Sequence, residues 1–311
     1  MNNVLITGAT SFIGSHLIKT LLNDYKIFAV IRPNSKKIGV LPKSDNLITL
    51  ELNMDEYDKI ADKINDNIDV FIHFAWVGTR GIERNNKIIQ ENNYRYSMMA
   101  LKCAIDLRVK TFITAGSQAE YGPWVKEYKQ SEDVEAKPNT EYGKIKLKFY
   151  ESANVICSEN KIRFIEPRFF SLYGPGDFEG TMVISTLKKM LLGIDCDLTQ
   201  GIQKWDFLYI DDAVLGLKQL IENTEAKGIY NFGYGESHLL KEYIQKMYEI
   251  TKSNSKLKWG RIPYPKTGIV NIDPCVNKLK SIGWTPKVTF DEGIKEIIKY
   301  IIYCVDKRDN R

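Results

Sequence analysis

The chain has few residues of the kinds that form disulfide frameworks and metal centres. Its 311 residues include five cysteines, an odd number without C-x-x-C spacing, which favours reduced thiols over disulfides or a zinc site. The three histidines, His16, His73 and His238, lie far apart in the sequence. His73 falls in the apolar run 70–75, where a histidine hydrogen-bonded within the core is the simpler interpretation. The sequence therefore predicts no metal site.

Long apolar runs are also missing. No stretch of about 18 consecutive apolar residues occurs, so we expect no transmembrane helix and no membrane partner. The N-terminus enters a strand-like run directly, without a basic and apolar leader, which favours a cytoplasmic protein. The formal net charge of +5 is modest and the basic residues are dispersed, so nucleic acid is not an expected partner.

The sequence does contain an alternation of strand and helix patterns. Apolar runs predict strands near 3–7, 26–31, 47–52, 69–74, 110–116 and 162–167, and helical periodicity predicts helices near 12–24, 56–66, 85–107 and 141–159. Such alternation is typical of an α/β fold with a parallel sheet and helices on both faces. The elements become shorter beyond residue 167. We expect one domain over 1–167 and a mainly separate, smaller α/β domain over 168–311, with some elements packing back on the first.

The first strand pattern ends in a turn of small residues. Residues 7–14 read Thr-Gly-Ala-Thr-Ser-Phe-Ile-Gly, and a helical pattern follows at once. A strand, a tight turn and a helix place backbone N–H groups and a helix N-terminus where a pyrophosphate can bind. Small residues also build ordinary turns between strands and helices, so this turn alone leaves nucleotide binding undecided.

A second constellation lies further along the chain. Ser117 ends the apolar run 111–116, and Tyr142 and Lys146 stand four residues apart, on one face of the predicted helix 141–159. A cation within about 4–6 Å favours the phenolate of a tyrosine and lowers its pKa from about 10. Such a phenol becomes a proton donor or acceptor that is usable near neutral pH. The three side chains are therefore candidate catalytic residues.

Together these constellations resemble the extended short-chain dehydrogenase/reductase family, the nucleotide-sugar epimerases, dehydratases and ketoreductases. That family carries a T-G-A-T-G-F-I-G turn, a Ser or Thr four residues before a Tyr-Gly pair, and a later Y-x-x-x-K. This chain matches the pattern with residues 7–14, with Ser117 before Tyr121, and with Tyr142 and Lys146.

Further blocks in the same order extend the resemblance nearly from end to end. Residues 168–177, 205–212 and 282–286 resemble the family's R-x-x-N-V-Y-G-P-G, R-D-F-I-Y-V-D-D and L-G-W-x-P segments. The resemblance implies a Rossmann-type, doubly wound parallel sheet with a smaller C-terminal α/β substrate domain. It also implies a dinucleotide cofactor and a nucleoside-diphosphate sugar as substrate.

The resemblance assigns site residues by position. Catalytic roles fall to Ser117, Tyr142 and Lys146. The expected cofactor-binding residues are Gly8, Thr10, Ser11, Phe12, Ile13, Gly14, Arg32, Asn53, Met54, Phe74, Ala75, Trp76, Asn93, Ala115, Tyr142, Lys146, Pro167, Phe169 and Phe170. The expected substrate-binding residues are Trp76, Arg80, Ser117, Gln118, Ala119, Tyr142, Ser171, Lys204 and Trp205.

The residues after the second predicted strand favour NADP(H). In NAD-specific folds this strand ends with an acidic residue that binds the ribose 2′-hydroxyl. Here residues 27–31 run into Arg32, with Ser35 and Lys36 nearby and no carboxylate. An arginine makes charge-assisted contacts with a 2′-phosphate. A basic, solvated loop is the alternative interpretation, and NAD(H) is the alternative cofactor.

Several positions depart from the family pattern. Ser11 replaces the middle glycine of the turn, where its Cβ crowds the pyrophosphate or its hydroxyl bonds a phosphate. Asn53 replaces an aspartate that faces the adenine amino group, and still offers an acceptor oxygen. Gln118 and Ala119 stand where the related 4,6-dehydratases carry Asp-Glu, which argues against dehydration. Trp205 replaces an arginine that often holds the substrate pyrophosphate.

The segment 75–85 resembles the 4-ketoreductase branch of the family. In that branch Trp76 would wall the sugar pocket and Arg80 would approach a sugar oxygen or a phosphate; simple packing is the alternative role for Trp76. The helix predicted near 85–107 commonly pairs in this family with the helix that carries Tyr142. We therefore expect a homodimer, with a face of the monomer core as the alternative.

These features predict an NADPH-dependent reduction of the 4-keto group of a nucleoside-diphosphate 4-keto-6-deoxyhexose, in deoxysugar biosynthesis. Hydride would pass from the nicotinamide to the carbonyl carbon. Tyr142 would protonate the oxygen, Lys146 would lower the pKa of Tyr142 and bind the nicotinamide ribose, and Ser117 would position the carbonyl oxygen. An NAD-dependent nucleotide-sugar 4-epimerase is the second hypothesis. A non-catalytic NADP-binding regulator is the third, and the intact catalytic residues argue against it.

Overall fold

A parallel sheet forms the centre of the protein. The computed structural model describes residues 2–264 and 269–309. The sheet has eight strands, in the order β12-β7-β5-β4-β1-β2-β3 with β6 beside β7. They are β1 (Asn2–Thr7), β2 (Tyr25–Ile31), β3 (Leu47–Glu51), β4 (Val70–His73), β5 (Thr111–Thr114), β6 (Gly116–Ser117), β7 (Arg163–Phe169) and β12 (Gly228–Phe232). The chain order reverses between β1 and β4, so these two strands form a topological switch point.

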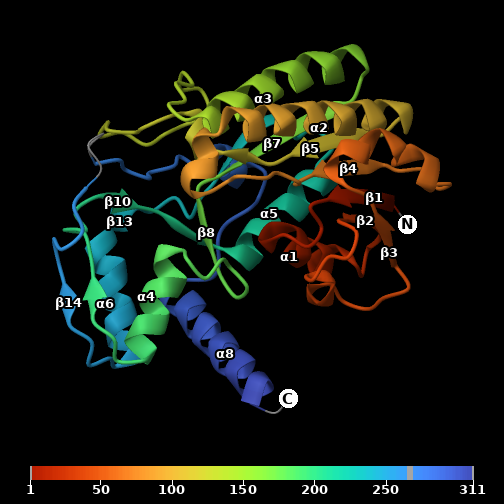
Figure 1. Cartoon of the computed structure of the whole chain (residues 1–311). Coiled ribbons are helices and arrows are strands. Elements are labelled where there is room, and N and C mark those ends of the chain that lie inside the picture. The colour runs from red at the N-terminus through yellow and green to blue at the C-terminus, as the bar shows by residue number, and fades with distance from the viewer. Residues whose placement is uncertain (1, 265–268, 310–311) are drawn as a thin grey trace.

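Helices cover both faces of this sheet, as Figure 1 shows. Two of them, α2 (Lys87–Asp106) and α3 (Glu141–Glu159), pack on one face; α1 (Phe12–Leu21) and α5 (Ile210–Glu222) pack on the other. Neighbouring residues of a strand point to opposite cores, because side chains alternate along a strand. In β1, Leu5 faces the α2 and α3 side and Ile6 faces the α1 side. The predicted doubly wound α/β fold is confirmed.

Shorter elements follow β7. Three pairs of strands lie outside the main sheet: β8 (Ser171–Tyr173) with β11 (Phe207–Tyr209), β10 (Lys204–Trp205) with β13 (His238–Leu239), and β9 (Cys196–Asp197) with β14 (Leu257–Lys258). The other α-helices in the described residues are α4 (Met182–Leu191), α6 (Leu240–Thr251), α7 (Asn277–Ser281) and α8 (Phe290–Asp309). The strand β12 joins the main sheet, and α5 packs beside α1. The part of the chain after β7 therefore also contributes a strand and a helix to the domain that residues 1–167 begin. The division at residue 167 stays a prediction.

The α-helix predicted at 56–66 is wrong. Two short 3-10 helices occupy this stretch, at Met54–Lys59 and Ala61–Lys63. The stretch 56–66 holds three aspartates, whose side chains compete with the backbone for hydrogen bonds and so disfavour a helix. Tyr57 and Ile60 nevertheless face the core under α2, so the apolar spacing marked the buried side correctly. The other strands and helices predicted within residues 1–167 are present.

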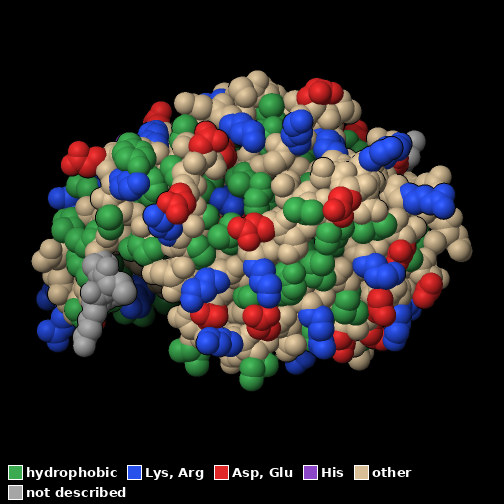
Figure 2. All heavy atoms as spheres, turned by 90° about the horizontal axis from the view of Figure 1, so that it is seen from above, with side chains coloured by type: hydrophobic (Ala, Val, Ile, Leu, Met, Phe, Trp, Pro, Cys, Tyr) green, Lys and Arg blue, Asp and Glu red, His purple; other side chains and the backbone are tan. Residues whose placement is uncertain are grey.

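The surface over α2 and α3 mixes charges of both signs. Figure 2 shows Lys and Arg side chains interspersed with Asp and Glu on this face, rather than gathered into one basic area. Within residues 2–264 and 269–309, no helix is both long enough and apolar enough to cross a membrane. In the same described residues, no group of three or more His, Cys, Asp or Glu side chains is placed to hold a metal ion.

Candidate active site

The turn between β1 and α1 depends on two glycines. Gly8 has φ +69°, and a Cβ on it would come within 2.7 Å of the Ala75 nitrogen. A Cβ on Gly14 would come within 2.4 Å of the Gly8 oxygen. Ser11 closes the turn: its N–H donates to the Gly8 oxygen at 2.9 Å, and its hydroxyl accepts from the Gly14 N–H at 3.1 Å. Ser11 is thus the N-cap of α1, a role that the sequence did not suggest.

A cavity of about 1030 Å³ begins at this turn and runs to Ser117 and Tyr142. It lies outside the carboxyl ends of the parallel strands, where open α/β sheets bind ligands. The predicted residues that line it are Thr10, Ser11, Phe12, Ile13, Phe74, Trp76, Arg80, Ala115, Ser117, Tyr142, Lys146, Phe169, Phe170, Ser171 and Trp205. The close glycine turn and the N-terminus of α1 fit a dinucleotide pyrophosphate at this end.

The other predicted residues do not line the cavity. They are Gly8, Gly14, Arg32, Asn53, Met54, Ala75, Asn93, Pro167, Gln118, Ala119 and Lys204. The Arg32 side chain is exposed just after β2, and its contact with a cofactor stays a prediction. Asn93 is buried and holds the loop after β4 instead: its oxygen accepts from the Val77 N–H at 3.0 Å, and its amide donates to the Val77 carbonyl at 2.8 Å.

The structure brings the three predicted catalytic residues together at one end of the cavity. Ser117 ends β6, and Tyr142 and Lys146 lie in the first two turns of α3. The Lys146 ammonium donates to the Ala115 carbonyl at 2.5 Å and lies 3.6 Å from the centroid of a Trp76 ring. It lies 5.9 Å from the Tyr142 ring centroid. The Trp76 and Tyr142 rings meet edge to face at 6.1 Å.

Burial has the largest effect on the pKa values of Tyr142 and Lys146. It raises the pKa of Tyr142 to about 12, against a hydrogen bond with Ser117 and the charge of Arg84, which lower it. It lowers the pKa of Lys146 to about 8, against nearby buried carboxylates that raise it. We expected Lys146 to lower the pKa of Tyr142; the cation that lowers it here is Arg84, and burial has the larger effect. The phenol is therefore protonated at neutral pH, the form that a proton donor requires.

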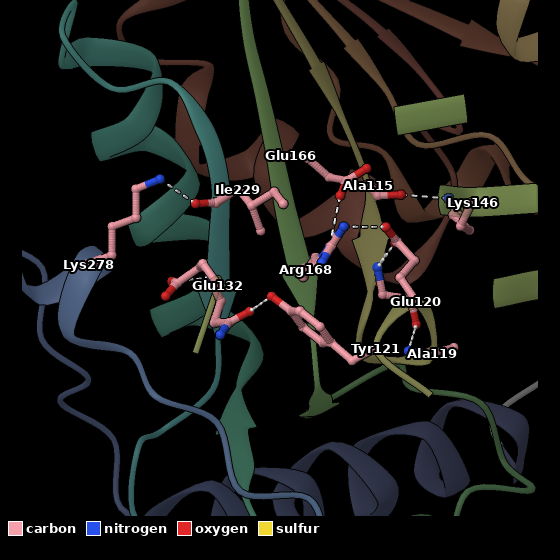
Figure 3. Close-up of polar contacts among 12 residues, drawn as sticks. Ala115, Ala119, Glu120, Tyr121, Glu132, Lys146, Glu166, Arg168, Ile229 and Lys278 are labelled. Atoms are coloured by element: carbon pink, nitrogen blue, oxygen red, sulfur yellow. Dashed lines mark hydrogen bonds and ion pairs between the residues drawn. The ribbon is translucent and has the colours of Figure 1, made fainter. Parts of the chain in front are cut away.

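Glu120, Glu166 and Arg168 form a buried ion network, as Figure 3 shows. Arg168 binds Glu120 at 3.0 Å and Glu166 at 2.9 Å, and all three side chains are at most 2% exposed. The other oxygen of Glu120 accepts the backbone N–H of Ser117 at 2.7 Å. A Cβ on Gly116 would come within 2.7 Å of Glu166, so β6 rests on the network. The network thus fixes the strand that presents the Ser117 hydroxyl.

A fully buried glutamine fixes the wall that carries Trp76. The Gln90 oxygen accepts from the Trp76 indole N–H at 2.9 Å and from Asn93 at 3.2 Å. Its amide donates to the carbonyls of Gly78 at 2.9 Å and Glu83 at 3.0 Å. All four hydrogen-bonding positions of this side chain are therefore used. Sequence reasoning missed Gln90, because one glutamine on a helix carries no recognisable motif.

An ion pair joins the two sides of the cavity. Arg80 lies 3.5 Å from the buried carboxylate of Asp177, and its guanidinium lies 4.5 Å from the Phe178 ring centroid. Arg80 thus lines the cavity, but its partner here is a carboxylate of the chain itself. Asp177 lies in the block 168–177 that resembles the family pattern, but nothing in the sequence predicted its contact with Arg80 across the cavity. Lys37 and Gln203 also line the cavity, and the sequence did not identify either of them as a site residue.

The chain resembles known proteins both in sequence and in fold. Residues 4–233 match the model of the NAD dependent epimerase/dehydratase family. The chain is 28% identical over 302 residues to CDP-abequose synthase from Salmonella muenchen, covering 95% of this chain and 96% of that protein. The crystal structure of UDP-glucose 4-epimerase with UDP-glucose from Thermotoga maritima superposes with a TM-score of 0.88 at 24% identity, covering 97% and 99%. UDP-glucuronic acid 4-epimerase from Bacillus cereus in complex with NAD gives 0.82 at 23% identity, covering 96% of each chain. These two likenesses concern the fold.

Proposed function

The chain belongs to the NAD dependent epimerase/dehydratase family, and within it we propose that the protein reduces the 4-keto group of a nucleoside-diphosphate 4-keto-6-deoxyhexose with NADPH. The observation that carries the proposal is the convergence of Ser117, Tyr142 and Lys146 on a cavity that begins at the α1 turn. The similarity to a protein named CDP-abequose synthase supports a nucleotide-linked deoxysugar as the substrate.

Each catalytic side chain has a distinct task in this proposal. When bound, the reduced nicotinamide supplies the hydride. The protonated Tyr142 gives its proton to the sugar oxygen, and the Ser117 hydroxyl holds that oxygen in place. Lys146 is held by the Ala115 carbonyl beside Trp76, where it can contact the cofactor ribose and contribute positive charge near the phenol.

The two positions at which a dehydratase carries its acid and base favour reduction over loss of water, because neither holds a carboxylate in this chain. Gln118 and Ala119 supply no carboxylate at the positions where the related 4,6-dehydratases carry Asp-Glu. The next residue, Glu120, has a carboxylate, but it is fully buried and engaged by the Ser117 N–H and by Arg168. It cannot reach a substrate in the cavity.

NADPH as the reductant rests on the charge around the end of β2. Arg32 follows β2 without an acidic residue, and Lys37 lines the cavity a few residues later. We expect Arg32→Ala to raise the Kd of NADPH about tenfold, the effect of losing one charged hydrogen-bonding partner, and to leave the Kd of NADH unchanged. Fluorescence titration of both cofactors measures this. Equal losses for NADPH and NADH would contradict the assignment.

A screen for NADPH oxidation tests the reaction itself. Nucleoside-diphosphate 4-keto-6-deoxy sugars, generated in place with dehydratases, are offered one at a time, with Tyr142→Phe as the matched control. We expect one sugar nucleotide to cause stoichiometric NADPH oxidation by the wild type.

A 4-epimerase is the second candidate, and the likeness in fold to 4-epimerases favours it. Purified protein that retains NAD and interconverts two sugar nucleotides without net NADPH consumption would establish epimerisation and overturn the reductase proposal.

We also propose a homodimer through α2 and α3. Both helices carry exposed apolar side chains, with Ile88 75% and Val155 56% exposed. Burial of such side chains favours association. Light scattering coupled to size exclusion should give twice the monomer mass, and Val155→Glu should reduce it; a monomeric wild type would contradict the proposal.

A further inference from the structure

Two cations lie beside the phenol ring of Tyr142, and the nearer one is not the expected lysine. The guanidinium carbon of Arg84 lies 4.7 Å from the Tyr142 ring centroid, whereas the Lys146 ammonium lies 5.9 Å away. Lys146 is also committed elsewhere, to the Ala115 carbonyl and the Trp76 ring. Arg84 therefore makes the closer of these two cation contacts with the phenol.

Several contacts fix the segment that carries Arg84. Arg84 lies in the 3-10 helix Gly81–Asn85, and its guanidinium donates to the Thr79 carbonyl at 3.4 Å. The next residue, Asn85, accepts the backbone N–H of Glu141 at 3.2 Å, which ties the segment to the start of α3. Gln90 holds the preceding carbonyl of Glu83 at 3.0 Å. These contacts fix the backbone that carries Arg84 and hold its guanidinium beside the Tyr142 ring.

We propose that Arg84 is a positioning residue for proton transfer, placed against the Tyr142 ring to stabilise the negative charge that develops on the phenol oxygen. The inference rests on the proposed role of Tyr142 as the proton donor. In that step the O–H bond of Tyr142 breaks, the proton goes to the sugar oxygen, and the electron pair stays on the phenolate. The phenolate takes a proton from solvent before the next turnover.

The charges around the phenol explain why a second cation matters. Burial raises the pKa of Tyr142 to about 12, and the carboxylates of Glu120 and Glu166 raise it as well. Arg84 and the Ser117 hydroxyl lower it. Removing a cation at this distance shifts such a pKa by about one unit or more, which is a tenfold change in the proton-transfer equilibrium.

The chain offers a matched control for this test. Arg95 makes a similar contact with Tyr96, at 5.0 Å from the ring centroid, but its side chain is exposed and lies outside the cavity. Arg95→Gln therefore removes an arginine that stacks on a tyrosine without touching the site. Arg84→Gln removes the charge at the site, and Arg84→Lys restores it.

The direct measurement is the ionisation of residue 142 in the full chain. A fluorinated tyrosine placed at position 142 is titrated by ¹⁹F NMR in the wild-type, Arg84→Gln, Arg84→Lys and Arg95→Gln backgrounds. We expect Arg84→Gln to raise this pKa by about one unit, and the other two variants to leave it within about a third of a unit. An unchanged pKa in Arg84→Gln would overturn the proposal.

Kinetics then separate this inference from the proposed function. On a sugar nucleotide that the wild type reduces, Arg84→Gln should lower kcat about tenfold with an unchanged KM for NADPH, and Arg84→Lys should recover most of it. Full kcat in Arg84→Gln overturns the role of Arg84 alone. Absence of any NADPH oxidation by the wild type overturns the proposed function, while the NMR titration still decides whether Arg84 acts on the phenol.

Discussion

Replacing Arg168 by methionine should destabilise the protein strongly, and more at higher pH. Arg168 is the only cation bound to Glu120 and Glu166 in the described network, at 3.0 and 2.9 Å, with all three side chains almost fully buried. Removing one partner of a buried ion pair leaves uncompensated charge and costs about 3–5 kcal/mol. Since folded domains are stable by about 5–15 kcal/mol, the variant should fold but with a much smaller margin.

The pH dependence follows from Glu166. Burial, together with the charge of Glu120, raises the pKa of Glu166 well above its ordinary value, so the folded state binds this proton more tightly than the unfolded state. Stability from such a group is present below its unfolded pKa and is lost as pH rises through its folded pKa. Without Arg168, Glu166 loses the positive charge that lowers its pKa, so this pKa rises further. The loss in Arg168→Met should therefore be smaller near pH 5 than near pH 8.

Urea unfolding followed by tryptophan fluorescence measures both effects. The free energy of unfolding is compared between wild type and Arg168→Met at several pH values, with Arg95→Met as the surface control. Adding Glu120→Gln and Glu166→Gln to Arg168→Met should recover part of the loss, because neutral amides remove the buried charge. A loss below about 1 kcal/mol, or one that does not change with pH, would refute the reasoning.

Substitutions at three further positions test the β1–α1 turn and the wall of the cavity. Gly8→Ala places a Cβ at φ +69° against the backbone after β4; strain of about 1–3 kcal/mol should lower the midpoint of thermal unfolding and abolish NADPH binding by fluorescence titration. Ser11→Ala should cost about 0.5–2 kcal/mol by removing the N-cap of α1, and Ser11→Gly only a few tenths, as measured by urea unfolding; equal costs would argue against the cap. Gln90→Leu leaves the carbonyls of Gly78 and Glu83 without their donor and should cost about 1–3 kcal/mol, while NADPH oxidation assays show a lower kcat/KM.

Local patterns in the sequence predict most strands of the main sheet and most of the helices between them. The inner strands of the main sheet, such as β2, β4 and β5, are buried on both sides, so each reads as an apolar run, whereas the edge strand β3 is partly exposed. The helices between the strands show clear periodicity. The stretch 56–66 shows the limit of this reasoning. Its apolar spacing marks the buried side, but its aspartates prevent the α-helix that the spacing indicates.

Some residues of the site could be predicted from the sequence, and others could not. The residues of the turn at 7–14, with Ser117, Tyr142 and Lys146, are recognisable because their spacing is set by local geometry. The contacts of Arg84, Gln90 and Arg80 are not, since each depends on how a loop folds back on a distant helix or loop. The pKa of Tyr142 is a further example, because the depth of burial that dominates it is a property of the fold and not of the Tyr-Lys spacing.

Turnover by Tyr142→Phe, measured beside NADPH binding, is the most direct test of the account. The substitution removes only the phenol oxygen from a buried ring. Loss of a general acid predicts that kcat for NADPH oxidation falls about 10²-fold or more, while the Kd of NADPH stays within about twofold. A variant that binds NADPH normally and reduces the sugar nucleotide at the wild-type rate would contradict the central claim that this phenol delivers the proton.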